Sequence, residues 1–376
     1  MASANASPSW FQRFVLPGFA FKAVVIGGGY ATGRELAEFF LPAGPLGGLL
    51  AIILAMFVWS GVCVLTFMFA RQVQAYDYRA FFRALLGPFW IAFEIAYLLF
   101  LILILSVFGA AADEMGAKAF GLPAFVGSIL LVAAIAAVVA FGTSAVERLF
   151  KWVTFFLYGV YAVFAVLALS SFGQTALSNV EHAAPSRDWL MGGLTYGGYN
   201  VVGAVVILPV LRHLTSTKDA IVAGVLAGPL AIWPAFLFFF CMLAFYPQIG
   251  SETLPSDFML TQLHLPSFRI AFELMIFAAL LESGAGAVHG FIERVAGVYQ
   301  ARRKRDLSKA GRLFIAAILL VSAVFIAGKI GLVDLIASGY RALAITIVIV
   351  FVAPLLSIGA WKLFAVRSSR AALQQT

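Results

Sequence analysis

The chain has 376 residues, of which 63% are hydrophobic and 11% are charged, and its formal net charge is +8. A soluble domain carries about 25% charged residues, so this composition excludes a soluble globular protein and predicts an integral membrane protein. The excess of basic residues is then expected in loops on the cytoplasmic side, and nucleic acid is not an expected partner.

A transmembrane helix needs about 20 predominantly apolar residues. Ten stretches of the chain meet this requirement, which predicts an all-α membrane protein with ten transmembrane helices. The predicted spans are Leu16–Phe40, Pro45–Arg71, Phe89–Ala112, Pro123–Gly142, Phe150–Phe172, Trp189–Arg212, Ala220–Tyr246, Ser267–Val295, Gly311–Ile330 and Val333–Leu363.

Ten spans place both chain ends on one side of the membrane, and the basic residues identify that side. Of the 25 Lys and Arg residues, three lie within spans and four lie on the far side, which leaves 25 − 3 − 4 = 18 on the side of the termini. Because cytoplasmic loops are enriched in Lys and Arg, residues 1–15 and 366–376 are predicted to be cytoplasmic. The basic run at 302–305 fits the same side.

The first span contains an unusual run of glycines. It reads Gly27-Gly28-Gly29-Tyr30-Ala31-Thr32-Gly33. Glycine costs roughly 1 kcal/mol relative to Ala inside a helix, and an opened backbone is tolerated in a membrane only against protein or a watery cavity. The run therefore predicts a helix that is interrupted at membrane depth.

The chain also repeats itself. In span six, Gly197-Gly198-Tyr199-Asn200-Val201-Val202-Gly203 matches Gly28-Gly29-Tyr30-Ala31-Thr32-Gly33 of span one. In span eight, Phe272-Glu273-Leu274 matches Phe93-Glu94-Ile95 of span three. Five spans separate the copies, so the second copy enters the membrane upside down. Glycine-interrupted spans at matching places in two halves are the best sequence pointer to a transporter binding site. The alternative is that these glycines only allow close helix packing.

These features resemble the five-plus-five inverted-repeat fold of the leucine transporter, in the amino acid–polyamine–organocation superfamily. The stretch from Gly27 to Glu35 is similar to the opening of an amino acid permease family of bacterial membrane proteins. The resemblance implies a first repeat at 16–172, an extracytoplasmic loop at 173–188, a second repeat at 189–365, and a place in the bacterial inner membrane.

In such a fold, discontinuous helices 1 and 6 hold a small-molecule substrate. The predicted substrate-binding residues lie at the two interruptions. They are Gly27, Gly28, Gly29, Tyr30, Ala31, Thr32, Gly33, Tyr196, Gly197, Gly198, Tyr199 and Asn200. Backbone N–H groups at an opened helix attract an anion, so the resemblance implies that a substrate carboxylate binds there.

Charged residues inside a membrane are functional candidates by default. Glu282 lies near the middle of span eight and is followed by Ser283. A carboxylate, a hydroxyl and carbonyl groups suit Na⁺ or a proton, so Glu282 and Ser283 are predicted to couple transport to one of these ions, with a possible Na⁺ site at Gly27 and Ser283. The alternatives are that Glu282 binds a substrate amine or pairs structurally with Lys22.

Arg34 and Asp334 lie near the outer ends of spans one and ten, and the resemblance implies that they pair to close an outer gate. The roles of Glu94, Glu273 and His289 stay open. The sequence contains no His/Cys metal cluster, no phosphate-binding loop and no nucleophile elbow, so neither an organic cofactor nor an enzyme is expected.

The predicted function is therefore a secondary active transporter of a small zwitterionic solute of the amino acid class. Two alternatives stay open: a membrane sensor or accessory subunit that binds a ligand without moving it, and a channel.

Overall fold

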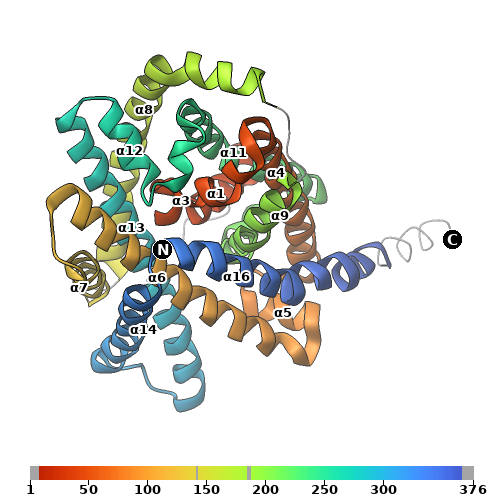
Figure 1. Cartoon of the computed structure of the whole chain (residues 1–376). Helices are drawn as coiled ribbons and strands as arrows, with labels where there is room; N and C mark the ends of the chain where they lie inside the picture. The colour runs from red at the N-terminus through yellow and green to blue at the C-terminus, as the bar shows by residue number, and fades with distance from the viewer. Residues whose placement is uncertain (1–7, 141–142, 184–187, 366–376) are drawn as a thin grey trace.

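The computed structural model describes residues 8–140, 143–183 and 188–365, and within these ranges it is helical with no β-strand. Figure 1 shows the arrangement of the helices. Their bounds are α1 Leu16–Val25, α2 Gly28–Ala31, α3 Arg34–Phe39, α4 Gly44–Val73, α5 Tyr78–Leu86, α6 Ile91–Phe120, α7 Val126–Ala140, α8 Thr143–Glu181, α9 Trp189–Asn200, α10 Gly203–Val206, α11 Thr217–Met242, α12 Pro255–Gln262, α13 Pro266–Arg303, α14 Lys309–Ile330, α15 Leu332–Asp334 and α16 Tyr340–Ile347.

Seven helical stretches of the described chain are long and apolar enough to cross a membrane. They overlap predicted spans two, three, five, seven, eight, nine and ten. The other three predicted spans coincide with the interrupted segment α1–α3, the short helix α7, and the interrupted segment α9–α10. The membrane class and the helical fold are thus confirmed, whereas the count of ten crossings stays a prediction.

One predicted boundary is wrong. Residues 173–188 were expected to form a loop, but α8 continues as a helix to Glu181. Leu177 is exposed on this extension, and Ala176 is buried. The segment is helical because it still presents an apolar side to the molecule, and the predicted loop is therefore helical as far as Glu181.

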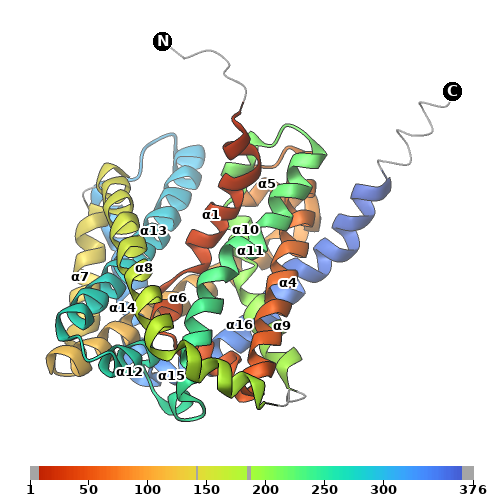
Figure 2. The same cartoon turned by 90° about the horizontal axis from the view of Figure 1, so that it is seen from above.

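Two groups of helices pack around the centre of the molecule. In one group, α4 packs against α11 and α9, and α1 packs against α11; in the other, α13 packs against α8 and α7, and α6 packs against α7 and α14. Figure 2 shows α1 of the first group and α6 of the second near the middle of the molecule. Small residues allow the close approach of α4 and α11: a Cβ at Gly224 would lie 2.6 Å from the backbone of Val64.

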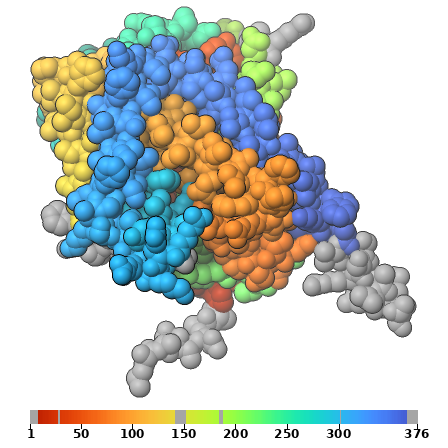
Figure 3. Space-filling model, turned by 90° about the horizontal axis from the view of Figure 1, so that it is seen from below, coloured from red at the N-terminus to blue at the C-terminus, as the bar shows by residue number. Residues whose placement is uncertain are grey.

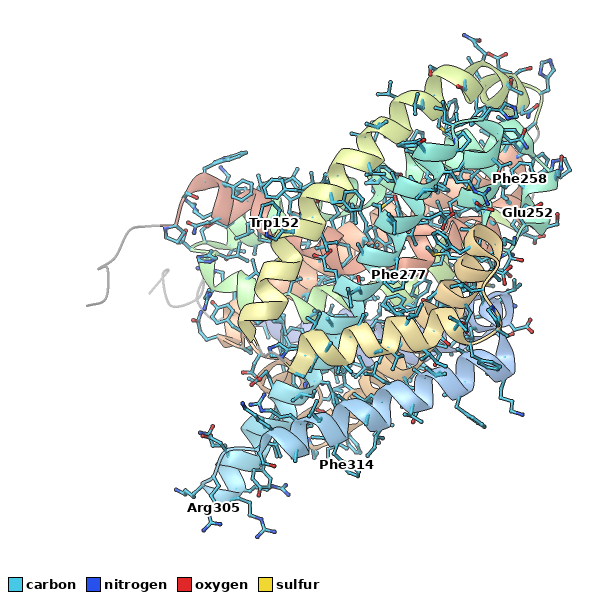
Figure 4. All side chains as sticks on the ribbon, turned by 90° about the vertical axis from the view of Figure 1, so that its left-hand side faces the viewer. Trp152, Glu252, Phe258, Phe277, Arg305 and Phe314 are labelled. Carbon is cyan, nitrogen blue, oxygen red and sulfur yellow. The ribbon has the colours of Figure 1, made fainter. Side chains whose placement is uncertain are left out.

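The first and last described helical segments reach the same side of the molecule (Figure 2). Figure 4 shows Arg305 on this side and Glu252 and Phe258 on the opposite side. The basic turn between α13 and α14 therefore lies with the chain ends, as the span prediction requires. We call these the terminus side and the far side.

The outside of the helical body is apolar. In Figure 3, α6 lies between α14 and α16 on one face of the molecule. Exposed side chains on these helices include Ile95, Leu99, Phe314 and Phe325. A surface of this size and composition is stable in contact with lipid rather than with water.

Candidate functional site

The first predicted interruption is present. Helix α1 ends at Val25, and Ile26 leaves the helical conformation with φ −76° and ψ 83°. One helical turn, α2, follows, and Gly33 then adopts φ +77° before α3 begins. This φ is open to glycine at little cost, since a Cβ in the left-handed region crowds the backbone. The span is therefore broken on both sides of a single turn.

The second predicted interruption is slight and lies later in the chain. Gly197 to Asn200 stay helical as the end of α9, and Val201 and Val202, which separate α9 from α10, keep right-handed helical dihedrals of φ −62°, ψ −15° and φ −55°, ψ −29°. The Gly197 carbonyl accepts a hydrogen bond from the indole of Trp59 at 3.2 Å, so it is already paired within the protein. Since α9 packs closely on α4, its glycines remain in helical geometry.

A direct hydrogen bond joins the two interrupted segments. The Tyr199 hydroxyl on α9 donates to the Glu35 carboxylate on α3 at 2.5 Å. Glu35 is 5% exposed and is in none of the ion pairs of the described residues. Glu35 is not among the site residues predicted from the sequence, although an acidic residue inside a predicted span is a functional candidate by default.

A small cavity of about 20 Å³, enough for one water-sized group, lies between the two interruptions. Gly27 and Glu35 line it from the first segment, and Tyr199, Asn200 and Val202 from the second. The remaining walls are apolar and aromatic, from α6 and Tyr340. The structure thus brings together part of the predicted substrate set, namely Gly27, Tyr199 and Asn200.

A larger cavity of about 370 Å³ adjoins this one and shares Gly27 with it. Its walls come from the end of α1 next to the interruption, from middle stretches of α6 and α13, and from α8 and α10. Glu282 and Ser283 both line it. Its volume falls within the range of about 300–1,000 Å³ that is usual for small-molecule sites.

Two charged side chains face this larger cavity. Glu282 accepts a hydrogen bond from the Thr154 hydroxyl at 3.3 Å. The Lys22 ammonium lies 4.5 Å from the centre of the Tyr158 ring. Lys22 and Glu282 do not form an ion pair with each other, so the alternative of a structural pair between them is not supported.

The far side of the site is closed by Arg34. Its guanidinium donates to the Glu38 carboxylate at 2.7 Å and to the carbonyls of Gly250 and Glu252 at 2.9 and 3.0 Å. The expected Arg34–Asp334 pair is wrong: Asp334 is exposed on α15, whereas Arg34 is buried. The pairing fails because α3 carries its own acid one turn beyond Arg34.

The same closure reaches the interruption itself. The Ser256 N–H donates to the Thr32 carbonyl at 3.0 Å, which ties the start of α12 to the turn before Gly33. Figure 4 shows this region, around Glu252 and Phe258, at the far end of the molecule. One carbonyl that the interruption frees is therefore used by the protein and is not available to a solute.

Two of the predicted tyrosines have packing roles. Tyr196 is fully buried, and its ring centre lies 4.8 Å from that of Phe40 and 5.5 Å from that of Trp59. Tyr30 is also buried and lines a cavity of about 40 Å³ with Tyr161 and Met275. Neither tyrosine is among the residues that line the two cavities at Gly27.

Comparison with solved structures identifies the fold. MhsT in complex with L-phenylalanine matches with a TM-score of 0.58 at 16% identity, covering 98% of this chain and 100% of that one. The Eremococcus coleocola manganese transporter, in complex with an aromatic bis-isothiourea substituted compound, matches with a TM-score of 0.55 at 15% identity, covering 95% and 81%. The chain therefore has the fold of the leucine-transporter type, as predicted.

The sequence comparisons are less specific. No family model matches the chain. The uncharacterized membrane protein YkvI of Bacillus subtilis is 25% identical over 326 residues, which cover 86% of this chain and 89% of that protein. This similarity agrees with the membrane class, and membership of an amino acid permease family stays a prediction.

Proposed function

We propose that this chain is a secondary active transporter that moves a small zwitterionic solute of the amino acid class by alternating access. The observation that carries the proposal is the cavity of about 370 Å³ at Gly27. It adjoins an interrupted helix, and the contacts of Arg34 tie the segment beyond this interruption to the far side. A hollow beside an interrupted helix that is closed toward one side of the molecule is what one state of an alternating-access cycle requires.

The lining of the cavity favours a zwitterion over a metal ion as the solute. Among the described residues there is no group of three or more His, Cys, Asp or Glu side chains that could hold a metal. The two similar structures are one protein bound to L-phenylalanine and one manganese transporter, so the fold alone does not choose between these solutes. The mostly apolar walls, with one acid and one base, fit an amino acid better.

Coupling to Na⁺ or H⁺ is proposed to run through Glu282 and Ser283. Both line the same cavity as Gly27, so a cation bound there would lie beside the interruption of the first segment. A binding event at this position can bias the angle between α1 and the rest of the molecule. A movement of α1 would then expose the cavity to one side or the other.

The test is uptake of radiolabelled amino acids into proteoliposomes under an imposed Na⁺ or proton gradient. Glu282→Gln is expected to reduce gradient-driven uptake at least tenfold, whereas the exposed Glu181→Gln on α8 leaves it unchanged. Wild-type rates in Glu282→Gln would remove Glu282 from coupling. Ligand binding without counterflow in the wild type would favour the sensor over the transporter.

A further inference from the structure

Lys22 differs from the other buried base of the described chain. Only Lys22 and Arg34 are basic residues in the buried class there, with 9% and 6% exposure. Arg34 has a carboxylate partner, Glu38, and two carbonyl partners. The contacts of the Lys22 ammonium are the faces of two aromatic rings, Tyr158 at 4.5 Å and Phe19 at 5.9 Å.

A buried charge is costly unless it is paired, and cation–π contacts return about 0.5–2 kcal/mol. Lys22 lines the larger cavity, and its position on α1 is one turn before the interruption at Ile26. Glu282 lines the same cavity from α13 without reaching Lys22. The ammonium is therefore placed to pair with an anion that enters the cavity.

The backbone of the interruption offers less to such an anion. The N–H of Gly27, the residue of the interruption that lines both cavities, already donates to the Val25 carbonyl at 2.9 Å. Helix α2 has four residues, so its dipole is small. Lys22, in contrast, carries a full charge within the same walls.

The rest of the lining determines the kind of anion. Val24, Phe100, Leu101, Ile104, Phe108 and Leu157 provide an apolar wall around the two charged groups. A phosphate or a dicarboxylate carries a second negative charge, which would lie unpaired against this apolar wall. An amino acid with an apolar side chain places its one carboxylate at Lys22 and its side chain against this wall, and Glu282 in the same cavity offsets the charge of its ammonium.

We propose that Lys22 binds the carboxylate of a transported amino acid whose side chain is apolar. This inference rests on the proposed transport function and specifies its substrate class. It makes Lys22, rather than the opened backbone at Gly27, the group that selects for a carboxylate.

The test combines variants with matched ligands. Binding of L-phenylalanine and of 2-phenylethylamine, which lacks the carboxylate, is measured by calorimetry on the purified wild type, Lys22→Gln and Lys22→Arg. The same pair of measurements is made with L-leucine and isoamylamine. Lys329→Gln is the control, because Lys329 is an exposed lysine on α14 that lines a different surface hollow.

The wild type and Lys329→Gln are expected to prefer each amino acid over its amine by about tenfold to a hundredfold, the usual effect of a charge-assisted hydrogen bond. Lys22→Gln is expected to lose this preference, and Lys22→Arg to keep most of it. A preference that survives in Lys22→Gln overturns the proposal and assigns the carboxylate to the backbone.

The assignment of Lys22 and the proposed transport function are tested by different outcomes. Gradient-driven uptake of other amino acids, with no binding of L-phenylalanine or L-leucine, overturns the assignment of Lys22 and leaves the transporter intact. Absence of uptake and counterflow for every amino acid overturns the proposed function itself.

Discussion

The two interrupted segments use glycine in different ways. In the first segment, Gly33 has φ +77°, so the glycine permits a backbone conformation. In the second segment, Gly192, Gly193 and Gly197 all lie within the helix α9, and a Cβ on any of them would come within 3.1 Å of another helix or turn. There the glycines permit close packing, and the backbone keeps right-handed helical dihedrals through Val202.

The comparison teaches that a run of glycines does not locate an interruption. Where a glycine lacks a Cβ opposite a neighbouring helix, the two backbones approach closely, and this contact stabilises the helix that contains the glycine. A glycine with a positive φ breaks the helix. The sequences of the two segments are alike, so the difference comes from the partners: α4 lies along α9, whereas the turn at Gly33 lies against Phe238 and Pro255.

The largest expected effect is at Gly192. A Cβ there would lie 1.9 Å from the carbonyl oxygen of Phe39, which is backbone and cannot rotate away. Gly192→Ala is expected to reduce the free energy of unfolding by about 3 kcal/mol through overpacking. The measurement is thermal unfolding in detergent. The control is Gly173→Ala on α8, where a Cβ meets nothing within 4 Å; an equal loss in both variants would contradict the packing role.

Gly33→Ala tests the other use of glycine. The left-handed conformation costs a non-glycine residue about 1–2 kcal/mol, and the Cβ would also lie 2.6 Å from the Phe238 ring. We expect a loss of about 2 kcal/mol in unfolding free energy, together with a loss of ligand binding, because the turn beside the site must move. Wild-type stability and binding would show that this conformation is not needed.

Tyr199→Phe tests the link between the segments. The variant removes the hydroxyl that donates to Glu35 and leaves a buried carboxylate without this partner. The expected loss is about 1–3 kcal/mol, the usual range for an unsatisfied buried group. Tyr246→Phe, at a 38% exposed tyrosine, serves as the control in the same unfolding assay. If both variants unfold alike, the bond between the segments contributes nothing measurable.

The smallest effect is expected at the far side. Glu38→Gln removes a partly buried ion pair with Arg34 but leaves the two carbonyl partners of that guanidinium in place. We expect the closed far side to lose about 0.5–1 kcal/mol of stability. The measurement is the rate at which a thiol reagent, added from the far side, reacts with a cysteine introduced at Gly27, and this rate is expected to rise. No change in access would show that Glu38 does not contribute to the closure.

The sequence by itself determined the membrane class, the helical fold and the first interruption. Apolar length fixes which segments can cross a bilayer, and a lipid environment forces their backbones into helices, so composition and periodicity suffice at this level. It also identified Gly27, Tyr199, Asn200, Glu282 and Ser283, which the structure places on the walls of two adjoining cavities.

Only the tertiary structure decided which side chains meet. It paired Arg34 with Glu38 rather than Asp334, joined Glu35 to Tyr199, and left Lys22 and Glu282 apart in one cavity. These outcomes depend on the rotation of each helix about its axis and on its depth relative to its neighbours. Both are set by packing between segments that lie far apart in the chain, and no local pattern of residues encodes them.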